Sequence, residues 1–284
     1  MTGTTDGETA SAFHRFRRWT IPLALVAVAS ASVVAFVHLS RRLAEARAAG
    51  AAVAARLDLS ERCHDAVEAV RGDLEASIER WSDDEAGRAW LSRCAFPVGT
   101  TPSGGAALSS NGPATLLLLA RPGTLEGTDP DGAPRFIPIV RIVAWYRAES
   151  TESPALASWE SEPLVQEAWL AALAVDERRD AVSILIRRGV SLAWNPGASG
   201  PRTLDGLTGD VAPEIDGSTT LKGNVRRWCG DAPGAPVLAR GLGRPAFYVA
   251  FVGAKNAEIH VTMEVKVDGR DAIRREIIAT ASSR

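Results

Sequence analysis

Residues 17–43 read RRWTIPLALVAVASASVVAFVHLSRRL, a long apolar run between basic residues. From Ile21 to Leu39 no residue carries a formal charge, and ten of the residues are Ile, Leu, Val or Phe. A helix of this length rises about 28 Å, close to the thickness of the hydrocarbon layer. Its insertion into a bilayer is favourable by roughly 3–6 kcal/mol. We therefore predict a transmembrane segment at residues 19–39.

A cleaved signal peptide is the main alternative for this run. Ala27-Val28-Ala29 and Ala29-Ser30-Ala31 both offer small residues at the spacing of a cleavage site. The apolar run continues past both sites through residues 33–37, which favours an uncleaved anchor over a signal peptide, and over a buried helix of a soluble protein. The short basic tail at 1–18 and the large domain after the run favour a single pass through the inner membrane. The tail would then be cytoplasmic and the rest of the chain periplasmic.

The helical pattern does not stop at the end of the apolar run. Residues 40–82 contain no proline and carry apolar residues at spacings that mostly combine threes and fours, as in an amphipathic helix. We predict a helical stalk continuous with the membrane segment; the alternative is two helices with a break near Gly50. The predicted packing stripe consists of Val53, Leu57, Cys63, Val67, Val70, Leu74, Ile78 and Trp81.

Residues 83–284 are predicted to form a β-rich head, so the fold class is α+β. In residues 258–267 apolar and polar residues alternate, which predicts a strand with one buried face, and Asp268-Gly269 is typical of a hairpin turn. A short helix is expected at 164–175, and loops at 99–113, 121–135 and 196–218. The other predicted strands are 114–120, 136–147, 155–159, 182–194, 237–239, 246–252 and 273–279.

Composition and motifs argue against several function classes. The net charge of −2 offers no broad basic surface for nucleic acid. The four histidines are scattered, and neither a phosphate-binding glycine loop nor a nucleophile elbow occurs. The three cysteines lack CxxC spacing; buried free thiols are favoured, although one pair could be bridged in an extracytoplasmic domain. We expect no cofactor, no metal site and no catalytic activity.

The segment LSERCHDAVEAVRGDLEASI at 59–78 resembles the late part of the first helix in pilin-type subunits. The likeness is strongest to J-type minor pseudopilins of type II secretion systems and to W-type minor pilins. Segments 111–123, 139–163 and 184–194 resemble the strands that follow in that family. The residues of 59–78 at the matching positions are Arg71, Asp73, Leu74 and Ala76.

This resemblance implies a fold, a function and partners. The fold would be a long helix, membrane-spanning in its first half and amphipathic in its second, packed on an antiparallel β-rich head. The function would be that of a non-catalytic minor subunit of a pseudopilus or type IV pilus-like apparatus for secretion or adhesion. Its partners would be other pilin-like subunits at a filament tip, together with the inner membrane.

The prepilin processing motif of the family is degenerate here. The pattern places the cleavage between Arg18 and Trp19, so that Arg18 stands where the family has Gly and Leu23 where it has Glu. This departure leaves a second interpretation open: a bitopic membrane protein with an extracytoplasmic β-rich domain that binds a ligand or a protein.

Overall fold

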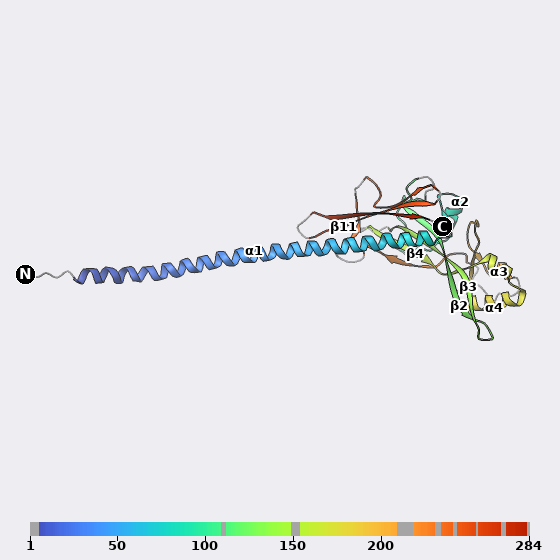
Figure 1. Ribbon diagram of the computed structural model, residues 1–284, viewed down its shortest axis with the longest axis horizontal. Helices are drawn as coiled ribbons and strands as arrows, with labels where there is room; N and C mark the ends of the chain where they lie inside the picture. Colours follow the sequence, from blue (N-terminus) through green and yellow to red (C-terminus); the bar gives the residue numbers. More distant parts are fainter. Residues whose placement is uncertain are drawn as a thin grey trace, which may run out of the picture. The chain divides into compact units, whose positions relative to one another are not determined.

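The computed structural model describes residues 6–108, 112–148, 154–208, 218–230, 234–240, 243–253, 255–267 and 271–282, with side chains from Leu23 onward. The chain divides into two compact units, residues 1–55 and residues 56–284. A long helix and a β-rich region are both present (Figure 1), which is compatible with the predicted α+β class.

Helix α1 runs from Asp6 to Ala76 and passes through Gly50 without a break. In the first unit, the large apolar side chains from Leu23 to Leu39 are each more than half exposed. Within the described residues, α1 is the one helix that is long and apolar enough to cross a membrane. Exposed apolar side chains of this density suit a lipid environment better than water.

Within the described residues of the second unit, the strands form one sheet of eight and one of four. In the larger sheet β1, β2, β3, β5, β6 and β7 lie side by side, with β4 beside β3 and β8 beside β4; all pairs are antiparallel except β5–β6. The smaller sheet has the order β10-β11-β12, with β9 also paired to β11. The strands are β1 (Glu79–Trp81), β2 (Leu116–Thr128), β3 (Pro134–Ala148), β4 (Ala155–Ser161), β5 (Leu164–Gln166), β6 (Leu192–Trp194), β7 (Arg202–Thr203), β8 (Gly223–Arg227), β9 (Val237–Leu238), β10 (Phe247–Val252), β11 (Asn256–Val265) and β12 (Ile273–Ser282).

Two sets of buried side chains form the cores of the larger sheet. Helix α2 (Glu85–Arg93) contributes Trp90 to one set, which also contains Tyr146 of β3 and Trp159 of β4. The second set joins β3 and β5 to helices α3 (Glu167–Ala172) and α4 (Val175–Arg187). A short helix, α5 (Asp205–Thr208), follows β7. The two sheets meet where Ala114 and Val249 exchange backbone hydrogen bonds of 2.8 Å.

Most predicted strands overlap a strand of the structure, but the prediction of a strand at 182–194 is wrong. Residues 175–187 form α4, and only the last three predicted residues are in a strand, β6. The apolar residues of α4 follow helical spacing, because Ala181, Val182, Ile184 and Leu185 are buried together. The predicted helix at 164–175 is divided between β5 and α3.

The predicted loop at 121–135 is also wrong, because β2 continues to Thr128 and pairs with β3 along its whole length. Pro122 and Gly123 interrupt a strand pattern, yet both are paired with β3. Pro122 is tolerated because β1 pairs with β2 only at residues 118–120, so that Pro122 lies where β2 is an edge strand. In the predicted loop at 196–218 the described residues include β7 and α5.

Strand β11 is present as predicted, but it is buried on both faces. Ile259, Val261 and Met263 are fully buried, and the alternating set His260, Thr262 and Glu264 is buried as well. The polar set is covered by neighbours: the ring of Tyr248 stacks on His260 at 4.2 Å, and Arg274 Nε donates to Glu264 at 2.9 Å. The predicted turn at Asp268-Gly269 lies outside the described residues, although β11 and β12 do pair as an antiparallel hairpin.

Candidate functional site

The part of α1 within the second unit is seated on the β-rich region by one side of the helix. Six of its side chains are buried. Cys63 Sγ lies 3.5 Å from the carbonyl oxygen of Val261 in β11 and 4.0 Å from that of Arg275 in β12. The smaller sheet therefore forms part of the surface on which this part of α1 packs, and we call that surface the seat of α1. The buried residues of this side are Leu59, Cys63, Ala66, Val67, Val70 and Leu74.

Four residues of the predicted packing stripe are buried in the helix, two are exposed on it, and two lie beyond its end. Cys63, Val67, Val70 and Leu74 are buried in the helix, whereas Val53 and Leu57 are 56% and 67% exposed. The buried row runs through Leu59, Cys63 and Ala66, and Leu57 does not lie on this row. The predicted stripe therefore combined residues from two different sides of the helix, although most of its spacings are three or four.

Ile78 and Trp81 do not belong to the helix, which ends at Ala76 rather than near residue 82. The hydroxyl of Ser77 donates to the carbonyl of Leu74 at 2.7 Å, and the N–H of Ile78 donates to Ala120 of β2 at 2.9 Å. From there the chain continues as β1. Trp81 is buried against Trp90, with ring centroids 5.1 Å apart, while half of the Ile78 side chain is exposed.

A network of ion pairs anchors the last turns of α1 to the larger sheet. Asp73 accepts hydrogen bonds from Arg121 Nη1 at 2.5 Å and from Trp145 Nε1 at 2.8 Å. Arg121 also donates through Nη2 to Glu160 at 2.6 Å, and Arg141 lies 3.3 Å from the same carboxylate. Burial lowers the pKa of Arg121, but Asp73 and Glu160 outweigh this effect, so that the pKa is raised overall. Asp73 is thus held by two side chains from different strands.

A hollow of about 310 Å³ lies beside this network. Its floor contains two tryptophans, Trp145 and Trp228, with ring centroids 5.1 Å apart. The guanidinium of Arg226 lies 3.9 Å from the Trp228 ring, and Trp228 Nε1 donates to Ser158 Oγ at 3.1 Å. Aromatic faces with an adjacent cation form a surface suited to a flat group.

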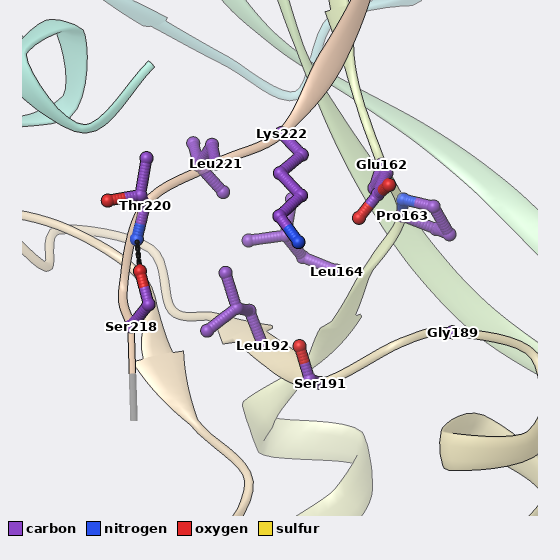
Figure 2. Close-up of a pocket in the computed structure, with 10 residues that line it drawn as sticks. All are labelled: Glu162, Pro163, Leu164, Gly189, Ser191, Leu192, Ser218, Thr220, Leu221 and Lys222. Atoms are coloured by element: carbon purple, nitrogen blue, oxygen red, sulfur yellow. Dashed lines mark hydrogen bonds between the residues drawn. The ribbon is translucent and has the colours of Figure 1, made fainter. Parts of the chain in front are cut away.

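A second hollow, of about 90 Å³, lies between β5 and the segment that precedes β8. Figure 2 shows the Lys222 side chain extending into it between Leu192 and Glu162. Pockets that hold drug-sized ligands are about 300–1,000 Å³. This hollow therefore has room for a few water molecules rather than a substrate.

The three cysteines lie in the described part of the chain and form no disulfide. Burial raises the pKa of Cys63 to about 11 and that of Cys94 to about 12, which keeps both thiols protonated at neutral pH. Within the part of the chain that the structure describes, no group of three or more His, Cys, Asp or Glu side chains could hold a metal ion.

Sequence reasoning singled out Asp73 but not its partners. Arg121, Glu160 and Trp145 are distant in sequence, and the one available signal was a charge directly after the apolar run LLLLA of β2. Arg18 and Trp19, the predicted processing site, lie within α1, but their side chains are outside the described residues. Comparison of the chain with protein-family models, curated proteins and solved structures finds no match.

Proposed function

We propose that this chain is a membrane-anchored, non-catalytic structural subunit of a pseudopilus or type IV pilus-like apparatus for secretion or adhesion. The observation that carries the proposal is the two-part character of α1. Its first part presents large apolar side chains that are more than half exposed, and its second part is buried along one side against β-strands. A helix of this kind can be held in lipid before assembly and pack against other apolar helices after it.

The anchoring of Asp73 supports a structural role for the helix. A simple membrane anchor needs no fixed rotation relative to its soluble domain. Here Arg121 and Trp145 both bind the same carboxylate, which fixes the side of α1 that faces the sheet. A subunit in a filament needs such a fixed face, because each surface of the helix must meet a particular neighbour.

Co-purification tests the assembly role. The full-length chain would be extracted from its native membrane in a mild detergent and recovered through a C-terminal tag, with an unrelated single-pass protein as the control. We expect enrichment of other proteins that carry a long apolar N-terminal helix and a β-rich domain. Recovery of the chain alone would contradict the proposal.

The N-terminal residue of the mature protein provides an independent test. A chain that begins at Trp19 supports pilin-type maturation between Arg18 and Trp19. A chain that begins at Ser30 or Ser32 is a secreted product without its anchor, which contradicts the proposal. An intact N-terminus at Met1 or Thr2 favours the second candidate function.

That second candidate is a bitopic protein with a binding domain, and the Trp145–Trp228 hollow favours it. Its volume lies at the lower end of the range for ligand pockets, and it contains two aromatic rings and a cation. In that case the partners recovered with the full chain would bind the head and lack the long apolar helix. Trp228→Ala would then weaken their recovery, whereas it would leave filament subunits bound.

A further inference from the structure

A third hollow in the second unit, of about 620 Å³, lies between residues 56–60 of α1 and residues 271–275 around the start of β12. Arg56 and Arg275 border it with exposed side chains. Arg274, which also lines it, is already bound to Glu264 at 2.9 Å. In the part of the chain that the structure describes, Arg56 and Arg275 form no ion pair or side-chain hydrogen bond. We call this hollow the basic groove.

The two arginines come from different elements, Arg56 from α1 and Arg275 from β12. Cys63 contacts the backbone of Arg275, and it lies seven residues, or about 10 Å, beyond Arg56 along the helix. Asp271 also lines the basic groove, so one of the two positive charges is partly offset.

The opposite side of the same helix carries an acidic stripe, defined as Asp58, Glu61, Asp65 and Glu68. At about 100° per residue, Glu61 and Asp65 point roughly away from the buried row through Leu59, Cys63 and Val70. Asp58 is paired with Arg62, and Glu68 with Arg71. Within the described residues, the side chains of Glu61 and Asp65 form no ion pair or hydrogen bond. The stripe extends over about 15 Å along the helix.

We propose that the acidic stripe of one copy of this chain docks in the basic groove of a second copy, with Glu61 and Asp65 facing Arg56 and Arg275. The two surfaces belong to different sides of one helix, so they cannot pair within a single chain. A contact between two different surfaces of identical chains repeats head to tail and extends as an open array unless the rotation closes a ring. Leu57, exposed at the edge of the groove, adds apolar area to the contact. This inference goes beyond the proposed function, which requires only other subunits.

Charge reversal at each surface tests the docking in the full chain, purified in detergent and measured by sedimentation velocity at low salt. The variant R56E/R275E has an acidic groove opposite an acidic stripe, and E61R/D65R has a basic stripe opposite a basic groove. Each variant alone should associate more than about 100-fold more weakly than the wild type, because like charges then face each other. The control R187E/R188E reverses two arginines at the end of α4, shifts the net charge by the same amount as R56E/R275E, and should associate like the wild type.

Mixing the two reversed variants is the decisive measurement. In the mixture each groove meets a stripe of opposite charge, so association should return to near the wild-type level and should weaken as salt is added. A mixture that stays monomeric overturns the proposal, as does a monomeric wild type or unchanged association of each variant alone. Misfolding could not produce recovery on mixing. If pilin-like subunits co-purify with the chain while these variants behave like the wild type, the docking fails and the proposed function stands.

Discussion

The carboxylate of Asp73 on α1 lies 2.8 Å from the indole nitrogen of Trp145 on β3, seventy-two residues later in the chain. The side chain of Asp73 is only 12% exposed, and Arg121 from β2 binds its other oxygen. Two adjacent strands thus bind one residue of the helix. An aspartate that is mostly buried and bound on both oxygens restrains rotation and sliding of the helix more strongly than apolar contacts alone.

Asp73→Asn should destabilise the second unit by roughly 2 kcal/mol. The amide oxygen can still accept one hydrogen bond, but the charge-assisted bond with Arg121 is lost, and such bonds contribute about 1.5–3 kcal/mol. The measurement is urea unfolding of the full chain in detergent, followed by circular dichroism. The control is Asp58→Asn, which removes an exposed ion pair with Arg62 and should cost less than about 0.5 kcal/mol. Equal effects of the two substitutions would contradict the anchoring role of Asp73.

Two glycines should respond in opposite directions to alanine. A Cβ at Gly72 meets nothing within 4 Å, so Gly72→Ala should stabilise α1 by up to about 1 kcal/mol. A Cβ at Gly87 would lie 2.1 Å from the carbonyl oxygen of Ser82, so Gly87→Ala must shift the start of α2 and should cost about 1–3 kcal/mol. Thermal midpoints of the two variants test this pair. A Gly87→Ala variant as stable as the wild type would show that the backbone at the start of α2 leaves room for a Cβ, contrary to the contact with Ser82.

The stability of the second unit should depend on pH through Glu79. Burial raises the pKa of Glu79 above its ordinary value of 4.5, although the N–H of Gly197 partly offsets the rise. Because the folded-state pKa is the higher one, the unfolded state ionises first. The contribution of Glu79 to the stability of the second unit is then fully present below about pH 4.5 and is lost as the pH rises through the raised pKa.

Glu79→Gln should therefore be more stable than the wild type at pH 7, and the difference should vanish in acid. Urea unfolding at several pH values measures this difference. The matched substitution Glu177→Gln changes an exposed carboxyl at the start of α4 and controls for the change in net charge. A gap between Glu79→Gln and the wild type that stays constant with pH would show that burial does not act on this carboxyl.

The thiols should resist alkylation until the chain unfolds. At pH 7.5 a pKa of about 11 leaves about one Cys63 thiol in several thousand ionised, and the thiolate is the reacting form. Cys94, with a pKa of about 12, should react still more slowly, and Cys229 is buried. Mass spectrometry after maleimide treatment should find no added label in the folded protein and three in urea. Rapid labelling of Cys63 would mean that α1 leaves its seat.

The sequence predicted the parts of the fold that depend on local pattern. The apolar run, the continuity of the helix through Gly50 and the strands β10, β11 and β12 follow from patterns that extend over about ten residues. The prediction of a strand at 182–194 failed because strand and helix patterns cannot be told apart over an apolar run as short as 182–186. Its burial is decided by Ile137 and Ile139 of β3, which lie more than forty residues earlier.

The Asp73 network could be predicted only in part for the same reason. A carboxylate on a helix indicates an anchor once the opposing arginine is known, and Arg121 is forty-eight residues away. Spacing alone does not show how far along the helix the sheet extends, so the sequence could not show which apolar residues of the predicted stripe are buried. The helix end at Ala76 has no proline or glycine to mark it; pairing of β1 with β2 ends the helix instead.

The seat of α1 has a consequence for biosynthesis. Cys63 rests against Val261, a strand residue 198 positions later, so the surface that receives the helix does not exist until nearly the whole chain has left the ribosome. At 5–20 residues per second this takes about 10–40 s. During that interval the apolar side of the helix beyond Leu59 is uncovered and open to non-native contacts.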